Sequence, residues 1–238
     1  MDKDTVNLSV VIPAYNEENT IEATLYNINE YFEKQNIIFE IVVVDDGSCD
    51  ETSSKVKSIA KKLNSVKLVS YKENKGKGEA ISQGVLVAKG EFILFSDADL
   101  STPIFEIEKF MPYLANGYDI VIGSRRVMDS QITRKQPFPR RLSGKVFQAL
   151  VRTILHLPFS DTQCGFKLFR GSIAKKLFSE LKHKGFVFDV EIIYRAVKSG
   201  YRIKEIGVIW ANDPTTTVRF LRDSFKCFVE LIQIRFQN

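Results

Sequence analysis

Short apolar runs alternate with longer segments of helical periodicity along the first half of the chain. Turn-forming or acidic residues bound the apolar runs at 8–12, 39–44, 66–70 and 91–95, which predicts a strand at each. The segments between them, 17–34, 50–63 and 78–88, have amphipathic spacing and predict helices. Strands that alternate with helices in this way are typical of an α/β fold with a mostly parallel, Rossmann-like sheet flanked by helices.

The second half of the chain has a less regular pattern. After an apolar run at 120–123, the polar stretch 125–141 contains several Arg and Pro residues and predicts a long loop, which inside a compact domain is usually functional. Further elements are expected as follows: helices at 146–155, 172–181 and 190–198, and strands at 166–169 and 202–209.

The final segment, 218–236, predicts a basic amphipathic helix. Its apolar positions are Val218, Leu221, Phe225, Phe228, Val229, Ile232 and Phe236, and its basic positions are Arg219, Arg222 and Lys226. We therefore expect one domain over residues 1–215 and a C-terminal helix over 216–238. The helix has two possible partners, the protein's own core or a second subunit on the one hand, and a membrane surface on the other.

Composition limits the function classes. With 238 residues, 44% hydrophobic and 26% charged, the chain matches one globular domain rather than a disordered protein. The net charge of +5 suits an acidic partner such as a diphosphate, a lipid phosphate or an anionic membrane, and does not point to nucleic acid.

Cysteine usage and hydropathy predict a cellular location. The three cysteines, Cys49, Cys164 and Cys227, are widely spaced and odd in number, which favours neither a disulfide framework nor a zinc site. No apolar signal core or long apolar run is present, so we expect a cytoplasmic protein whose membrane contact is at most peripheral, on the cytoplasmic face. The oligomeric state is left open.

Polar and acidic residues follow three of the predicted strands. Tyr15 and Glu17 follow the first, the pair Asp45-Asp46 the second, and the run 96–99 the fourth. In open α/β sheets ligands bind at the carboxyl ends of the strands. Carboxylates crowded there would repel each other unless a divalent cation or donor hydroxyl groups lay between them, so the pattern predicts a site for a hard metal ion.

Common nucleotide-binding motifs are missing from this sequence. It has neither G-x-G-x-x-G after the first strand nor G-x-x-x-x-G-K-[ST], which argues against dinucleotide oxidoreductases and P-loop kinases. The glycine- and lysine-rich run 74–78 precedes a predicted helix. It has two interpretations, a phosphate-binding loop or a tight turn with solvated lysines.

Four motifs occur in an order that resembles the family 2 glycosyltransferases, which have the GT-A fold. They are residues 10–17 (VVIPAYNE), 43–48 (VVDDGS), 74–78 (NKGKG) and 97–99 (DAD). The segments 99–103, 123–126 and 161–167 are most similar to the polyprenyl-phosphate branch, in particular to dolichyl-phosphate β-glucosyltransferases. The resemblance extends over nearly the whole chain.

The resemblance implies a set of donor-binding residues: Pro13, Ala14, Tyr15, Glu17, Asp45, Asp46, Lys77, Asp97 and Ala98. Asp97 and Asp99 would form a D-x-D motif in which Asp99 binds Mg²⁺ or Mn²⁺ and Asp97 contacts the metal or the donor ribose. Such a cation stabilises the negative charge of a departing nucleoside diphosphate. Asp45 is favoured to recognise the base, whereas Asp46 could stabilise the turn and Glu17 could begin a helix.

The acceptor side is predicted from basic residues after the strand at 120–123. A phosphate-binding set of Arg125, Arg126, Arg140 and Gln163 is expected, with a solvated basic loop as the alternative for Arg134, Lys135, Arg140 and Arg141. Cys164 is expected to be packed rather than nucleophilic. Asp189 and Glu191 either cap a helix or face the reacting centre, and with Asp99 and Arg125 they complete the candidate catalytic set.

The expected reaction is an inverting transfer of glucose from UDP-glucose to a polyprenyl (dolichyl or undecaprenyl) phosphate. The second pKa of a phosphate monoester is about 6, so this acceptor is already anionic and needs no strong base. A sugar hydroxyl would need Asp189 or Glu191 as the base. The alternatives are a soluble transferase acting on a glycan or small hydroxyl acceptor, a GDP-mannose-dependent polyprenyl-phosphate mannosyltransferase, and a sugar-nucleotide binding module without activity.

Overall fold

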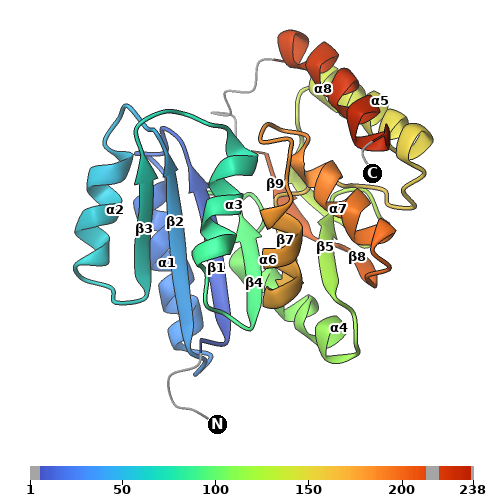
Figure 1. Cartoon of the computed structure of the whole chain (residues 1–238). Helices are drawn as coiled ribbons and strands as arrows, with labels where there is room; N and C mark the ends of the chain where they lie inside the picture. Colours follow the sequence, from blue (N-terminus) through green and yellow to red (C-terminus); the bar gives the residue numbers. More distant parts are fainter. Residues whose placement is uncertain (1–5, 213–219, 237–238) are drawn as a thin grey trace.

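The computed structural model describes residues 6–212 and 220–236 and contains a seven-stranded sheet with the order β3-β2-β1-β4-β7-β5-β8 (Figure 1). The strands are β1 (Leu8–Ala14), β2 (Phe39–Asp46), β3 (Val66–Tyr71), β4 (Phe92–Ser96), β5 (Ile120–Ser124), β7 (Phe166–Arg170) and β8 (Ile203–Gly207). Each strand predicted from the apolar runs is present, within two residues at its start.

The sheet is mostly parallel, as predicted. β1 pairs in parallel with both β2 and β4, and β5 pairs in parallel with β8. β7 is the exception, because it runs antiparallel between β4 and β5. The carboxyl ends of β2, β1 and β4 consequently lie side by side at one edge of the sheet.

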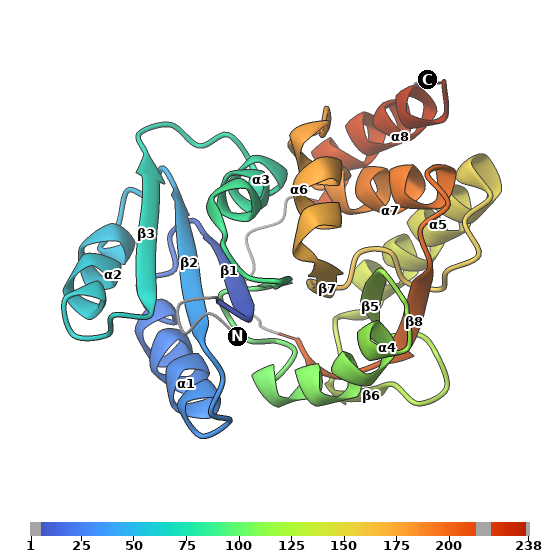
Figure 2. The ribbon, with the colours of Figure 1, turned by 60° about the horizontal axis from the view of Figure 1, so that its bottom comes forward.

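Helices cover both faces of the sheet (Figures 1 and 2). One face packs against α1 (Ile21–Glu33), α2 (Thr52–Ala60), the 3₁₀ helix η1 (Ile104–Lys109) and α4 (Met111–Ala115). The other packs against α3 (Lys77–Val87), α5 (Phe138–Leu155), α6 (Gly171–Ser179), α7 (Phe188–Lys198) and α8 (Phe220–Phe236). Side chains alternate between the two cores along each strand, which explains why a central strand such as β2 is apolar at successive positions.

The predicted long loop at 125–141 is wrong in part. Residues Gln131–Arg134 form β6, which pairs in parallel with β9 (Ile209–Ala211), and α5 begins at Phe138 instead of residue 146. Both elements depend on partners distant in sequence, so local periodicity did not reveal them. Proline in the first turn suits the start of α5, because a backbone N–H group there would have no intrahelical acceptor and proline therefore loses no hydrogen bond. η1 and α4 were not predicted.

α8 packs beside α5 and contributes to the same core (Figure 1). Leu231 and Ile234 are buried there, whereas Phe228, Val229 and Phe236 of the predicted apolar face are exposed. Val218 and Arg219 lie outside the described residues, as do the side chains of Leu221, Arg222, Phe225 and Lys226. The described part of the chain contains no helix with the length and apolar character needed to cross a bilayer.

Candidate active site

The loops that follow β1 and β2 are joined by hydrogen bonds between their backbones and side chains. Asn16 N–H donates to Ser48 Oγ at 3.0 Å, and Cys49 N–H donates back to Asn16 Oδ1 at 2.9 Å. Glu17 N–H donates to Thr52 Oγ1 at 2.8 Å. Asn16 has φ 55°, a left-handed conformation that Asn tolerates well. These contacts fix one wall of the site before any ligand binds.

The two acidic residues at the end of β2 have different partners. Asp45 Oδ1 accepts a hydrogen bond from Ser48 N–H at 3.0 Å. Both oxygens of Asp46 are occupied, by the N–H groups of Lys75 at 2.8 Å and Gly76 at 2.9 Å. Asp46 therefore holds the loop before α3, which is the turn-stabilising alternative for this residue.

The run 74–78 does not offer a backbone cradle for phosphate. Besides the two amides bound to Asp46, the N–H groups of Gly78 and Glu79 donate to Lys184 O, at 2.9 and 3.3 Å. These four amide groups are thus satisfied within the protein. The run instead places the side chain of Lys77 at the site, where Nζ binds Asp97 Oδ1 at 2.5 Å.

The D-x-D motif lies directly after β4 and is held from several sides. Asp99 accepts hydrogen bonds from both N–H and Oγ of Ser101, at 2.8 Å each. Thr24 Oγ1 of α1 donates to Ala98 O at 2.6 Å. The Asp97 carboxylate lies against Gly165, where no side chain would fit.

Electrostatics at the motif favour a cation. Burial and the neighbouring Asp97 charge raise the pKa of Asp99 above its ordinary value. Burial works to lower the pKa of Lys77, but the carboxylates of Asp97 and Asp189 outweigh it and raise that pKa. Two carboxylates and one lysine leave an excess of negative charge. Mg²⁺ and similar ions bind to one or two protein carboxylates plus substrate phosphates, so Asp97 and Asp99 fit a divalent ion shared with a diphosphate.

The remaining predicted donor residues occupy different environments. Tyr15 is exposed, and Pro13 is half-buried at the end of β1. Ala14 and Ala98 have their methyl groups in the core, and their contact with the donor stays a prediction. Glu17 lies in the turn before α1, where its carboxylate accepts a hydrogen bond from Thr20 Oγ1 at 2.6 Å.

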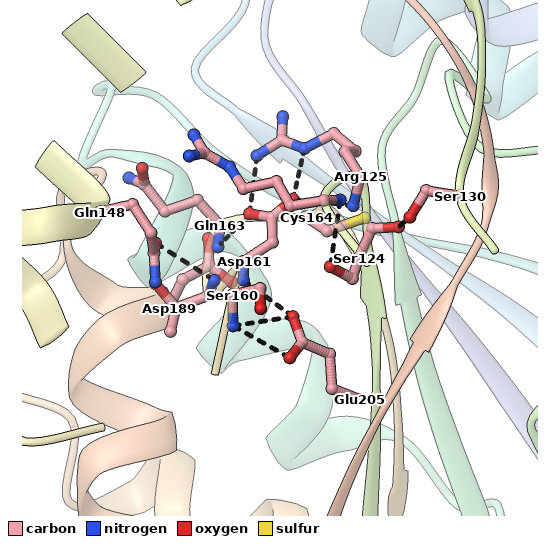
Figure 3. A network of polar contacts seen from close by, with 12 residues as sticks. Ser124, Arg125, Ser130, Gln148, Ser160, Asp161, Gln163, Cys164, Asp189 and Glu205 are labelled. Carbon is pink, nitrogen blue, oxygen red and sulfur yellow. Dashed lines mark hydrogen bonds and ion pairs between the residues drawn. The ribbon is translucent and has the colours of Figure 1, made fainter. Parts of the chain in front are cut away.

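Arg125 is fixed by the buried Asp161 on the opposite side of the site (Figure 3). Nε donates to Oδ2 at 2.7 Å and Nη2 to Oδ1 at 2.9 Å, and the Arg125 N–H also donates to Oδ2. Burial alone would raise the pKa of Asp161, but Arg125 holds it well below its ordinary value. The guanidinium stacks near Trp210, 5.5 Å from the ring centre. This arrangement fixes the geometry of Arg125 before an anion arrives.

Two further guanidinium groups lie close to Arg125, and neither forms an ion pair with an acidic side chain in the described part of the chain. Burial, followed by repulsion from Arg125, lowers the pKa of Arg140. The pKa of Arg126 is lowered by burial too, with Asp161 opposing that shift. Three guanidinium groups around one carboxylate favour the binding of an additional anion, such as phosphate.

These arginines help to line a cleft of 830 Å³ to which α5 and α8 also contribute. Gln163, which was predicted for the acceptor side, lines it too, and so do Lys135 and Arg141. The apolar side chains of the lining are Leu142, Val146, Phe147, Leu150, Phe186 and Phe228. The cleft therefore combines cationic and apolar side chains.

A second set of contacts supports the 160–165 turn and was missed in the sequence. Glu205 of β8 accepts hydrogen bonds from the N–H groups of Ser160 and Asp161 (Figure 3). Gln148 of α5 bonds to Thr162 and to Phe159 O. These residues are 11 to 45 positions away from their partners, and no local motif indicated them. Cys164 is fully buried within this turn, as expected, and burial raises its thiol pKa to about 11.

Asp189 and Glu191 do not face the cleft as free carboxylates. The buried Lys167 ammonium binds both Asp189 Oδ1 and Cys164 O. Glu191 is fully buried and accepts hydrogen bonds from His183 and from Arg195 Nε. The catalytic role of Glu191 stays a prediction, and in this structure its oxygens hold a loop and a helix together. Asp189 is close to Asp97 and Lys77 but paired.

Comparison with known proteins places this geometry in a family. The model of "Glycosyl transferase family 2" matches residues 9–178. The dolichyl-phosphate β-glucosyltransferase of Dictyostelium discoideum is 34% identical over 98% of this chain and 75% of its own length. The human enzyme of that name is 36% identical over 89% of this chain and 69% of its own.

Solved structures show the same fold at lower sequence identity. The glucosyl-3-phosphoglycerate synthase of Mycobacterium tuberculosis, in complex with Mn²⁺, UDP and glucosyl-3-phosphoglycerate, superimposes with a TM-score of 0.64 at 19% identity, over 96% of this chain and 78% of that one. The predicted GT-A fold and the predicted family are both confirmed. The chain belongs to glycosyl transferase family 2 and is a nucleotide-sugar-dependent glycosyltransferase.

Proposed function

We propose that the protein transfers glucose from UDP-glucose to a dolichyl or related polyprenyl phosphate, with inversion at the anomeric carbon. The observation that carries this proposal is the cleft beside Arg125, whose cationic side chains suit a phosphate monoester and whose apolar side chains suit an isoprenoid chain. The names of the relatives with 34% and 36% identity support the same donor sugar and acceptor.

The state of Asp189 favours a phosphate acceptor over a hydroxyl acceptor. A hydroxyl nucleophile needs a carboxylate that can take its proton. Burial raises the pKa of Asp189, which suits a base, but its Oδ1 is bound to the buried Lys167. A lipid phosphate is anionic near neutral pH, because its second pKa is about 6. It can attack without a base, provided that its charge is neutralised and its oxygen is aimed at the sugar. Arg125, Arg126 and Arg140 supply that neutralisation.

On the donor side, Asp97 and Asp99 would hold Mg²⁺ or Mn²⁺, which stabilises the charge that develops on the leaving diphosphate. Lys77, bound to Asp97, adds a second positive charge at the same end. Tyr15 and Asp45 border the wall where we place the uracil and ribose. Replacing Asp99 with Ala is expected to abolish transfer and leave the fold intact, because this partly buried carboxylate accepts its hydrogen bonds from Ser101 in its own turn.

The exposed faces of α5 and α8 are proposed to contact the membrane that carries the acceptor. Phe138 is 69% exposed and Phe236 is 79% exposed, and Leu142 and Val146 of α5 are also more than half exposed. Arg141 and Lys145 lie on the same helix as these apolar side chains. Apolar and basic residues together on interfacial helices favour anionic bilayers.

Membrane contact is tested with point variants instead of truncation, since removing α8 would also remove the buried Leu231 and Ile234 and expose the core against which they pack. The double variant Phe138→Ser and Phe236→Ser is expected to float less with anionic liposomes. The matched control is Phe105→Ser, because Phe105 is 47% exposed on η1, which packs against the other face of the sheet. Equal flotation of the double variant and the control would show that these faces of α5 and α8 do not bind the membrane.

The decisive experiment for the proposed function measures radiolabel transfer from UDP-glucose, and in parallel from GDP-mannose, into organic-extractable polyprenyl phosphate. Label from UDP-glucose in the lipid phase, lost with EDTA and restored by Mn²⁺ or Mg²⁺, is the expected result. Label from GDP-mannose alone would make the protein a mannosyltransferase. If hydroxyl acceptors cause metal-dependent release of UDP and no label enters the lipid phase, the assignment as a glycosyltransferase stands and the lipid acceptor is refuted.

A further inference from the structure

The segment 182–184, between α6 and α7, caps the first turn of α3 from outside that helix. Lys184 O accepts the N–H groups of Gly78 and Glu79, two of the amides that a helix start leaves without intrahelical partners. Lys184 Nζ also binds Glu79 Oε2 at 2.8 Å. The segment therefore holds the turn that carries Lys77, the residue bound to Asp97.

The segment and the start of α3 are closely packed. A Cβ on Gly76 would lie 2.7 Å from Lys184 O, and a Cβ on Gly78 would lie 2.6 Å from Phe188 Cβ. Glycine at both positions lets the segment and α3 approach this closely. A displacement of the segment must therefore move the first turn of α3 with it, together with Lys77.

The same segment is fixed on its other side by α7. Glu191 accepts hydrogen bonds from Lys182 N–H at 3.1 Å, from His183 N–H at 2.8 Å and from His183 Nδ1 at 2.7 Å. Arg195 Nε, one turn further along α7, binds Oε1 at 2.8 Å, the same oxygen that accepts from Lys182 N–H. This arrangement explains why Glu191 is buried and charged without facing the cleft.

His183 extends the connection to α8. Its Nε2 lies 3.1 Å from Gln233 Oε1, so one imidazole bridges α7 and α8. α8 lines the acceptor cleft through Cys227 and Phe228, and Phe186, just beyond the segment, lines the same cleft. The segment thus touches the donor-side helix at one end and the acceptor cleft at the other.

We infer that His183 is a positioning residue that couples the acceptor-side helix α8 to Lys77 at the donor site, through the cap on α3. This inference rests on the proposed function, in which Lys77 helps to bind the donor diphosphate. His183 touches neither substrate. Its effect on the donor passes through the Lys184 carbonyl, and coupling of this kind requires that both sites bias the same element.

The test measures the Kd of UDP-glucose by calorimetry, in the presence of Mn²⁺ and without acceptor. His183→Ala is expected to weaken donor binding about tenfold, within the range typical of coupled sites. His183→Asn and Gln233→Leu each remove the link to α8 and are expected to give similar, smaller losses that do not add when combined. The control is Arg235→Ala, which breaks another α8 contact, that of Nη1 with Tyr194 Oη at 3.3 Å.

A double-mutant cycle separates positioning from a general loss of structure. In a Lys77→Ala background, His183→Ala is expected to change the donor Kd by less than about twofold, because the residue through which it acts is gone. An unchanged Kd in His183→Ala, or an equal loss in Arg235→Ala, overturns the inference. Binding is measured apart from transfer, so a wrong acceptor assignment would leave this result interpretable.

Discussion

The contact between Asp97 and Gly165 provides a direct test of the D-x-D assignment. A Cβ on residue 165 would lie 2.5 Å from Asp97 Oδ1 and closer still to Oδ2 and Cγ, so Gly165→Ala requires the carboxylate to rotate away. Gly165 follows Cys164 in the turn that leads into β7, where pairing with β4 limits any backbone shift. The substitution therefore moves the first carboxylate of the motif without removing it.

The expected magnitudes for stability and activity differ widely. The ion pair of Asp97 with Lys77 is about 30% exposed on each side, so its loss costs at most about 1 kcal/mol of folding free energy. Removing a preorganised group that stabilises transition-state charge typically lowers kcat by about 10²–10³. For Gly165→Ala we therefore predict a drop in kcat of that size together with a Tm shift of only a few degrees.

Steady-state kinetics over a Mn²⁺ titration measure this effect. Gly165→Ala is expected to lower kcat and to raise the Mn²⁺ concentration for half-maximal rate, since one of the two carboxylates for the ion is displaced. Gly185→Ala is the matched control, because a Cβ there meets nothing within 4 Å. Wild-type kcat and Mn²⁺ dependence in Gly165→Ala would refute the role of Asp97 in metal and donor binding.

Three further predictions follow from the contacts of the site. Asp161→Asn is expected to destabilise the fold by about 2–3 kcal/mol and to raise the acceptor KM. Because the pKa of Asp161 is depressed in the folded protein, its stabilisation is present above about pH 4 and is lost on acidification. The free energy of urea unfolding should therefore differ less between pH 7 and pH 3 in the variant than in the wild type. Asp189→Asn leaves Lys167 buried without its ion-pair partner and is expected to cost about 3 kcal/mol in the same assay; an unchanged midpoint would contradict the pairing. Asn16→Ala loses the hydrogen bond to Cys49 and places a strained left-handed φ on alanine, whereas Asn16→Gly loses only the hydrogen bond. The KM for UDP-glucose should therefore rise more in the alanine variant, and equal KM values would show that the strain is unimportant.

Local patterns in the sequence were sufficient for the sheet and for the order of its elements. Apolar runs such as residues 39–44 are buried on both faces, and this requirement is visible in the sequence itself. The D-x-D position was predictable for the same reason, since a carboxylate pair directly after a buried strand must lie at the carboxyl edge. The β6-β9 pair was missed, because it depends on contacts between residues 131–134 and 209–211.

The chemical state of each carboxylate was decided only by the tertiary structure. Asp45 and Asp46 are neighbours in the sequence, yet Asp46 gives both oxygens to the loop before α3. Asp189 and Glu191 are similarly close, and their partners Lys167 and His183 come from different elements.

The sequence by itself therefore determined the fold, the family and the edge of the sheet where ligands bind, because burial patterns and short motifs are local. Which charges are paired, which are available to a metal or a phosphate, and where the cleft between α5 and α8 lies were decided by long-range packing. A side chain's hydrogen-bond partners depend on which elements the fold brings beside it, and periodicity carries no information about that.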